Sequence, residues 1–324
     1  MTTSETWDVV IVGAGPAGLA AGLYAARDRY KTLLVEKNGM PGGQIMLTEH
    51  IENYPGWEKV GGFELVEHMK NQVVNFGGEI RANRKVTNIE QTDEGLLSVQ
   101  LDGGKETVTT RAVILSPGSD YRQLGVPGED EMRQATRVSY CATCDGAFYR
   151  DKHVLAVGGG NTAAEDTVYL ASRFCKKVTM IHRRTEFRAQ AILVEELQKA
   201  AAEHDIDIKL PYVLETIVAN DEGTEIDHVQ IKNVDTDQVE QLQVDGVFIF
   251  VGMNPNTDWL ADIVEIDENG YIKADPVSLR TSMKGVWVAG DCRTQAAMQL
   301  ATACSDGVIA ALDAKKYFRN PKAW

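Results

Sequence analysis

Apolar runs are followed by glycine-rich turns and runs of small residues at two places in the chain. Residues 9–12 (VVIV) precede "GAGPAG", and residues 154–157 (VLAV) precede "GGGNTA". A short apolar run bounded by glycine is typical of a buried parallel strand, and the small residues after it let a helix pack closely. Each place therefore predicts a strand, a tight turn and a helix, the start of a Rossmann-like core.

Two further stretches alternate between apolar and polar positions. Residues 77–115 and 217–250 break into short alternating runs separated by turn residues. This pattern is typical of antiparallel strands. We therefore expect an α/β protein with two Rossmann-like (three-layer ββα) dinucleotide-binding domains, each carrying a β-meander, as an internal duplication recognisable by pattern.

The first strand–turn–helix unit has the residues of a pyrophosphate cradle. Gly13 allows a tight turn, Gly15 lets backbone amides approach a pyrophosphate, and Gly18 lets helix and strand pack closely. The helix N-terminus adds the positive end of its dipole. Glu36 closes the second apolar run, where an acid meets a ribose hydroxyl. This spacing predicts a dinucleotide site that fits the adenosine half of FAD.

The second unit ends differently. Residues 158–163 (GGGNTA) repeat the small positions, but the next strand closes with residues 181–184 (IHRR), and Arg188 follows one helical turn beyond. Guanidinium groups bind a 2′-phosphate with charge-assisted, often bidentate hydrogen bonds, whereas an acid would repel it. The second unit therefore predicts a site for NADP(H).

A third element returns near the end of the chain. The apolar run 286–289 leads into Gly290 and Asp291, followed by a long helical pattern of small residues. An Asp at a strand end can accept hydrogen bonds from the ribityl hydroxyls of a flavin. The order of the three elements predicts an FAD domain into which the NADPH domain is inserted.

Stretches rich in proline and polar residues mark the two expected crossings. We expect the FAD-binding domain over residues 1–117 and 247–324, and the NADPH-binding domain, which carries the Cys-x-x-Cys pair, over residues 118–246.

Composition narrows the possible partners. The chain has 324 residues, 33 basic and 47 acidic, with a net charge of −14, which would repel a nucleic-acid backbone. No window approaches the roughly 18 to 20 apolar residues of a membrane span, and the N-terminus lacks the basic and apolar parts of a signal peptide. We therefore expect no nucleic-acid partner, no membrane association and a cytoplasmic location.

Two of the five cysteines, Cys141 and Cys144, form a Cys-x-x-Cys pair followed at once by Asp145. Such a pair can be half of a zinc site, a structural disulfide or a redox dithiol. A zinc site needs two more ligands, and the other cysteines form no second pair. A structural disulfide is unusual in a reducing compartment. We therefore expect a redox dithiol and no metal, with Asp145 as a general acid or, alternatively, as a turn former.

Set in order, these parts resemble the low-molecular-weight, prokaryotic-type thioredoxin reductases over essentially the full length. The shared signatures are "GAGPAGLAAGLYAAR", "PGGQ", "ENYPG", "SYCATCDGAFYRDKHVLAVGGGNTAAEDTVYLA", "IHRRTEFRA" and "GVWVAGD". The resemblance implies a homodimeric thioredoxin-disulfide reductase, in which electrons pass from NADPH through FAD and the dithiol to thioredoxin. By family position, Cys144 would contact the flavin and Cys141 would attack the thioredoxin disulfide.

The resemblance also implies a rotation of the NADPH domain, because nicotinamide and disulfide use the same flavin face in turn. The residues expected at FAD are Gly13, Gly15, Pro16, Ala17, Gly18, Glu36, Lys37, Gly42, Gly43, Gln44, Asn53, Val86, Gly118, Asp291 and Gln299. The residues expected at NADPH are Gly158, Gly160, Asn161, Thr162, Ala163, His182, Arg183, Arg184 and Arg188.

The chain departs from the family pattern at two places. Met298 stands where the family usually has arginine, and residues 116–118 (SPG) stand where it has "ATG". A positive contact near the flavin ring is therefore missing. Trp324 ends the chain and is expected to be a docking aromatic or a disordered tip rather than a flavin-stacking residue.

Three other functions share parts of this pattern. A flavin-dependent dithiol oxidase and a ferredoxin-fed reductase have the same fold and a Cys-x-x-Cys pair, but neither needs a 2′-phosphate clamp such as Arg183, Arg184 and Arg188. A non-catalytic flavin redox sensor is the third alternative. Rapid flavin bleaching by NADPH in preference to NADH would distinguish the reductase from all three.

Overall fold

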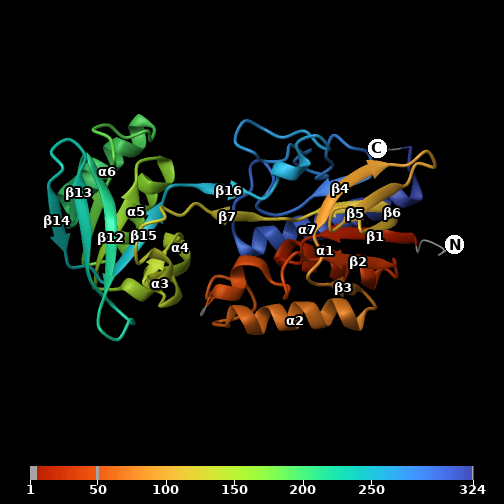
Figure 1. The fold of residues 1–324 in the computed structure, drawn as a ribbon, viewed down its shortest axis with the longest axis horizontal. Helices are drawn as coiled ribbons and strands as arrows, with labels where there is room; N and C mark the ends of the chain where they lie inside the picture. Colours follow the sequence, from red (N-terminus) through yellow and green to blue (C-terminus); the bar gives the residue numbers. More distant parts are fainter. Residues whose placement is uncertain (1–5, 49–50, 323) are drawn as a thin grey trace. The chain divides into compact units, whose positions relative to one another are not determined.

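The computed structural model describes residues 6–48, 51–322 and 324, and it divides into two compact units (Figure 1). Unit 1 comprises Met1–Asp120 and Asn254–Trp324, and unit 2 comprises Tyr121–Met253. The chain therefore changes unit at 120/121 and 253/254, and the expected boundaries lie at 117/118 and 246/247. At the crossings, β7 (Ser119–Tyr121) pairs with β16 (Met253–Pro255) in a two-stranded sheet.

Unit 1 is built around a sheet in which β6 is shared by a parallel core and a meander. The core runs β3-β2-β1-β6-β17, and β5 and β4 continue from the other half of β6 as antiparallel strands. The strands are β1 (Thr6–Val12), β2 (Thr32–Val35), β3 (Glu79–Arg81), β4 (Val86–Gln91), β5 (Leu97–Leu101), β6 (Glu106–Leu115) and β17 (Val286–Val288).

The sequence of β6 explains its double use. Exposed or half-exposed side chains alternate with buried ones in its first half, where it pairs with β5 and one face is solvated. Residues 112–115 are all buried, where β6 lies between the parallel strands β1 and β17. Parallel strands are covered on both faces, so their apolar runs are continuous.

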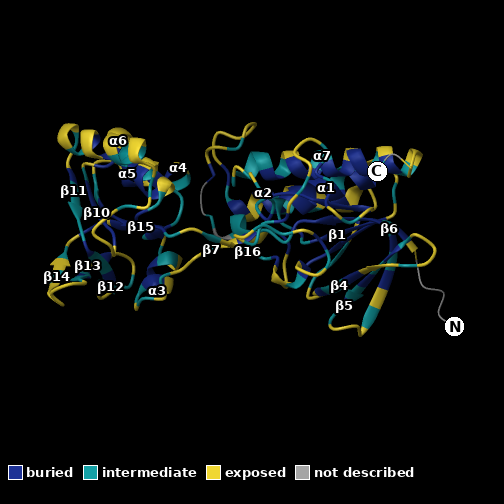
Figure 2. Ribbon diagram, turned by 90° about the horizontal axis from the view of Figure 1, so that it is seen from above, coloured by how far each residue is buried: buried dark blue, intermediate teal, exposed yellow. Residues whose placement is uncertain are grey.

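Helices cover one face of the unit 1 sheet, and β4 and β5 lie toward the other (Figure 2). Gly307 lets α7 approach α1, because an added Cβ would lie 2.1 Å from the Ala17 carbonyl oxygen. The helices are α1 (Pro16–Arg27), α2 (Gly62–Asn75) and α7 (Leu300–Arg319), with 3-10 helices η1 (Gly43–Leu47) and η3 (Asp258–Leu260).

Unit 2 repeats the plan in two separate sheets. A parallel sheet runs β11-β10-β9-β15-β8, and the meander β12-β13-β14 is antiparallel. The strands are β8 (Val138–Ser139), β9 (His153–Gly158), β10 (Lys177–Ile181), β11 (Ile206–Lys209), β12 (Tyr212–Ala219), β13 (Ile226–Asn233), β14 (Val239–Leu242) and β15 (Gly246–Phe250).

In unit 2 the meander and the helices α5 and α6 lie on opposite sides of the parallel sheet (Figure 2). The helices are α3 (Glu129–Gln134), α4 (Ala142–Asp145), α5 (Asn161–Arg173) and α6 (Ala191–Glu203), with the 3-10 helix η2 (Gly146–Tyr149). Both predicted Rossmann-like cores and both meanders are thus present, and the inserted arrangement is confirmed. No helix within the described residues is long and apolar enough to cross a bilayer.

Candidate functional site

The first glycine turn connects β1 to α1 and leaves one open side. Gly13 has φ +97°, and an added Cβ would lie 2.3 Å from the Ser116 carbonyl oxygen; one on Gly18 would lie 2.0 Å from the Gly13 carbonyl oxygen. Neither position can hold a side chain. An added Cβ on Gly15 would meet only the Gly43 Cα, at 4.0 Å. The open side at Gly15 therefore fits a pyrophosphate at the N-terminus of α1, where Pro16 and Ala17 begin the helix.

Glu36 is held rigidly at the end of β2. Its side chain is buried, and its two carboxylate oxygens accept hydrogen bonds from the backbone N–H groups of Ala14 and Asn38, both at 2.8 Å. Each oxygen keeps a second lone pair for a ribose hydroxyl. Lys37 is exposed, and Val86 is buried at the start of β4 in the same apolar cluster as Val35.

The loop that precedes η1 is joined to this cradle. The Gly42 N–H donates to the Ala14 carbonyl oxygen at 2.8 Å, so residues 42–44 lie beside the glycine turn. Asn53 lies close to Gln299 at the start of α7, with its Nδ2 3.4 Å from Gln299 Oε1. The structure thus brings the expected FAD residues of three distant segments together within unit 1.

The second glycine turn has the same form. An added Cβ on Gly158 would lie 2.6 Å from the Phe250 carbonyl oxygen, whereas one on Gly160 would meet nothing within 4 Å. Gly160 is thus the open position in front of α5. Ala163 is buried, Thr162 is exposed, and the Asn161 side chain accepts the Gln190 N–H at 2.9 Å.

Three arginines surround a cavity of about 550 Å³ beyond the end of β10. Arg183, Arg184 and Arg188 line it together with Thr185, Glu186, Phe187, Pro211 and Asp235. The Arg188 backbone N–H donates to the Gly159 carbonyl oxygen at 2.7 Å, so this cavity adjoins the glycine turn. Its donor set fits a 2′-phosphate.

His182 lies behind the arginines rather than among the residues that line the cavity. Its ring is buried against Gly159, where an added Cβ would lie 2.3 Å from Nδ1, and it stacks on Phe187 with centroids 5.8 Å apart. Burial, and then the charges of the three arginines, lower the pKa of His182. The imidazole is therefore better placed to support the glycine turn than to bind a phosphate.

Cys141 and Cys144 form a disulfide, with the two Cα atoms 5.3 Å apart. Cys141 is the residue before the first position of α4 and Cys144 lies within α4, which two residues separate from the end of β8. The Thr143 hydroxyl lies 3.4 Å from Cys141 Sγ. Within the described part of the chain, no group of three or more His, Cys, Asp and Glu residues is placed to hold a metal ion.

Asp145 is connected to the dithiol through Ser139. The Ser139 hydroxyl donates to the Asp145 carboxylate at 2.6 Å and accepts the Cys141 N–H at 3.1 Å. Burial raises the pKa of Asp145, and the hydrogen bond from Ser139 opposes this. A carboxyl group with a raised pKa close to a disulfide can hold a proton for a leaving thiolate.

Known proteins match the chain over nearly its whole length. The family model described as pyridine nucleotide-disulphide oxidoreductase matches residues 7–307. The chain belongs to this family. A thioredoxin reductase of Treponema pallidum is 42% identical over 96% of this chain and 97% of that protein, and one of Bacillus subtilis is 37% identical over 98% and 96%. A crystal structure of thioredoxin reductase from Streptococcus pyogenes has a TM-score of 0.88 at 39% identity, covering 98% of this chain and 99% of that one.

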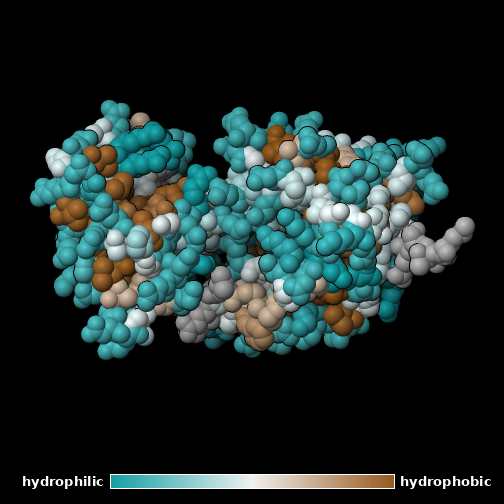
Figure 3. Space-filling model, viewed as in Figure 1, coloured by the Kyte–Doolittle hydropathy of each residue, from teal (hydrophilic) through white to brown (hydrophobic). Residues whose placement is uncertain are grey.

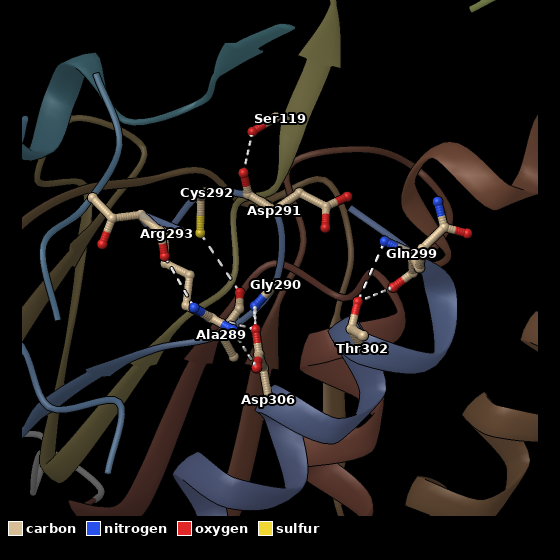
Figure 4. Close-up of polar contacts among 10 residues, drawn as sticks. Ser119, Ala289, Gly290, Asp291, Cys292, Arg293, Gln299, Thr302 and Asp306 are labelled. Atoms are coloured by element: carbon tan, nitrogen blue, oxygen red, sulfur yellow. Dashed lines mark hydrogen bonds and ion pairs between the residues drawn. The ribbon is translucent and has the colours of Figure 1, made fainter. Parts of the chain in front are cut away.

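The thioredoxin reductases of this family use FAD and NADPH. The carboxyl ends of β6 and β17 lie beside the first glycine turn, where FAD is expected. Gly118 has φ +69°, and an added Cβ would meet nothing within 4 Å, so the backbone there is open to a ligand. Asp291 follows β17, the neighbour of β6. Figure 4 shows its carboxylate turned away from Arg293, on the side of Gln299. Burial raises the pKa of Asp291 to about 6, with a smaller contribution from the Asp306 charge that Arg293 opposes.

Met298, one of the two departures from the pattern of the oxidoreductase family, and the terminal Trp324 now have a place. Met298 adopts a left-handed φ of 52° directly before Gln299, whose side chain takes part in a capping box with Thr302 at the start of α7. Trp324 packs edge-on against Trp287 with centroids 4.9 Å apart. Trp324 therefore packs within unit 1, which agrees with the expectation of a docking aromatic.

Several polar residues that support the site are not among those expected from the sequence. Ser139, Glu129 and Asp166 surround the dithiol segment, and Arg293 and Asp306 lie under the Gly290–Asp291 turn. Glu129 is buried, accepts the Tyr140 hydroxyl at 2.7 Å and holds the Gly125 N–H at 2.7 Å. Their roles depend on the hydrogen bonds and packing of the folded chain, which the motifs do not encode.

Proposed function

We propose that the chain reduces the disulfide of a thioredoxin with electrons from NADPH, by way of FAD and the Cys141–Cys144 pair. One observation carries the proposal: a disulfide-forming Cys-x-x-Cys with an adjacent part-buried carboxyl group lies in the same unit as an arginine-lined nucleotide cradle. The relatives named thioredoxin reductase, similar over nearly their whole length, support it.

FAD, when bound, supplies the two-electron chemistry that links a nicotinamide to a disulfide. The chain's own residues then have separate tasks. The acidic Glu36 and Asp291 hold hydroxyl groups, and the arginines distinguish NADPH from NADH by its 2′-phosphate. Reduction of the disulfide takes two electrons and two protons, and Asp145 can give one proton to a leaving thiolate.

Transfer to thioredoxin follows thiol–disulfide exchange. The Cys141 thiolate attacks one sulfur of the partner disulfide, which forms a mixed disulfide and releases the partner's other sulfur as a thiolate. Cys144 then attacks the mixed bond, restores the Cys141–Cys144 disulfide and releases the dithiol form of thioredoxin. The two electrons leave with the reduced thioredoxin, so Cys141 and Cys144 return to the disulfide state.

An anaerobic titration tests the proposal. NADPH should bleach the flavin absorbance rapidly and NADH slowly, and Cys144→Ser should retain bleaching but lose thioredoxin reduction. A flavin that NADPH does not bleach would favour the dithiol oxidase, the ferredoxin-fed reductase or the sensor. Thioredoxin reduction by Cys144→Ser at the wild-type rate would exclude the dithiol relay.

We also propose a homodimer. Phe63 and Val74 on α2 expose about half of their surface, and Trp57 and Phe76 near its ends are exposed as well. Figure 3 shows apolar patches within a mostly hydrophilic face, including at the place of α2 in Figure 1. Light scattering should give the mass of two chains, and Phe63→Ser should shift it toward one chain if α2 contributes to the interface.

A cytoplasmic location completes the proposal. Cys175, Cys292 and Cys304 are free thiols, and a reducing compartment preserves such thiols. Thiol alkylation of the denatured protein after cell fractionation would test this, since cysteines oxidised in an oxidising compartment would not react with the reagent.

A further inference from the structure

A buried ion pair lies beneath the turn that presents Asp291. Arg293 binds the Asp306 carboxylate in a bidentate manner, with Nε 2.7 Å from Oδ2 and Nη2 2.9 Å from Oδ1 (Figure 4). The Asp306 side chain is 7% exposed and that of Arg293 is 15% exposed. Bidentate pairs of this kind fix geometry as well as charge.

The same carboxylate also holds the backbone of the turn. Asp306 Oδ2 accepts the Gly290 N–H at 3.0 Å. Gly290 has φ +84°, and an added Cβ would lie 3.0 Å from the Ala17 Cβ in α1. The turn therefore depends on glycine, on close packing against α1 and on the Asp306 carboxylate.

We propose that Arg293 and Asp306 are positioning residues that fix the Gly290–Asp291 turn for the ribityl hydroxyls of FAD. The inference rests on the proposed FAD site. Asp306 anchors the backbone from α7, and Arg293 balances its negative charge so that the neighbouring Asp291 carboxylate is not repelled. Without Arg293, a buried and unpaired Asp306 would push against Asp291 and loosen the turn.

A second ion pair in unit 1 provides a matched control. Arg280 Nε lies 2.6 Å from Asp313 Oδ2, and this carboxylate oxygen also accepts the Trp287 Nε1–H at 3.0 Å. Asp313 comes seven residues after Asp306 on α7, two helical turns or about 10 Å along the axis. Both carboxylates are buried, and each binds one arginine and one further N–H donor. Asp313 also lies 3.9 Å from the exposed Lys316 ammonium group, and only Asp306 touches the Gly290–Asp291 turn.

The experiment measures how fast FAD leaves the purified holoenzyme on dilution, followed by the rise in FAD fluorescence. Arg293→Met and Asp306→Asn should each release FAD about tenfold faster than wild type, since each leaves a buried group unpaired. The double variant removes both charges and should recover most of the wild-type rate, a coupling expected of residues in contact. Arg280→Met should lower the unfolding temperature comparably but leave FAD release within about twofold of wild type.

Two results would overturn the inference. The first is that Arg293→Met releases FAD no faster than Arg280→Met does, because the effect would then be a general loss of stability. The second is that the fold-change in FAD release of the double variant equals the product of the fold-changes of the two single variants, since the residues would then act independently. A wild-type chain that retains no FAD would instead remove the proposed function itself, so the two failures are distinguishable.

Discussion

The Ser139 hydroxyl lies 2.6 Å from the Asp145 carboxylate, to which it donates a hydrogen bond. The same hydroxyl oxygen accepts the Cys141 N–H, and the Asp145 N–H donates to the Cys141 carbonyl oxygen at 3.1 Å. Ser139 therefore connects the proposed acid to the backbone of the attacking cysteine. This relationship fixes where the proton is held relative to the disulfide.

Removal of the Ser139 hydroxyl should misplace Asp145. Ser139→Ala is expected to slow disulfide reduction about tenfold. This is only part of the contribution of a general acid, because Asp145 itself remains. Because the hydrogen bond from Ser139 lowers the pKa of Asp145, its loss should raise that pKa further. The alkaline limb of the pH–rate profile should therefore move to higher pH, which stopped-flow measurements across a pH series would detect.

Ser139→Thr retains a hydroxyl and should keep a profile close to wild type. Thr143→Ala removes a different hydroxyl, which lies 3.4 Å from Cys141 Sγ, and should leave the alkaline limb in place. An unchanged limb in Ser139→Ala would show that Asp145 does not give the proton.

The fold follows from local pattern to a large extent. The apolar runs before Gly13 and Gly158 are buried strands, and the small residues after them begin α1 and α5. These signals are local, since strand, turn and helix are adjacent in sequence. The crossings were expected three and seven residues before the positions 120/121 and 253/254, because turn-rich stretches mark a region rather than one residue.

The supporting residues of the site were not predictable in the same way. Ser139 belongs to the Cys-x-x-Cys segment, but its role depends on how α4 turns back toward β8. Asp306 meets Gly290 across 16 positions, through a strand end and the packing of α7. His182 was expected at the phosphate, but its neighbour Gly159 leaves room that the imidazole fills instead. Such contacts are set by tertiary packing.

The arginines should select the nucleotide. Arg183→Ala, Arg184→Ala and Arg188→Ala should each weaken binding of 2′,5′-ADP by about tenfold or more, because each removes a charge-assisted contact. Binding of 5′-ADP should change by less than about twofold. Calorimetry on both ligands measures this, and Arg173→Ala, an exposed arginine at the end of α5, is the matched control. Equal losses for both ligands would place the 2′-phosphate elsewhere.

Asp166 on α5 should make unit 2 less stable as pH rises. Burial, and then the Glu165 charge, raise the pKa of Asp166 to about 6, and the Ala142 N–H opposes this. The folded-state pKa lies above the unfolded value. The contribution of protonated Asp166 to stability is therefore fully present below about pH 4 and is lost as pH rises through about 6.

Asp166→Asn should therefore stabilise the protein at pH 7.5 by about 1 to 2 kcal/mol, after allowance for partial exposure. At pH 4 the gain should be close to zero. Urea unfolding at the two pH values measures the difference. A gain that is the same at both would mean that packing, rather than ionisation of Asp166, determines the effect.

Gly160→Ala and Gly159→Ala add the same methyl group but should change different properties. The first should weaken nucleotide binding, and the second should lower the stability of unit 2. Gly160 has φ −96°, which alanine adopts freely, and an added Cβ would meet nothing within 4 Å. Gly160→Ala should therefore unfold at the wild-type temperature. In the complex, its methyl group would occupy space needed by the pyrophosphate of NADPH, and we expect binding to weaken about tenfold or more.

In Gly159→Ala the added Cβ would meet a side chain of the folded protein, since it would lie 2.3 Å from His182 Nδ1. The clash should destabilise unit 2 by about 1 to 3 kcal/mol. Thermal unfolding without ligand and calorimetry with NADP⁺ separate the two effects. If Gly160→Ala bound NADP⁺ as tightly as wild type, the pyrophosphate would not lie at this turn, and the open position would need another explanation.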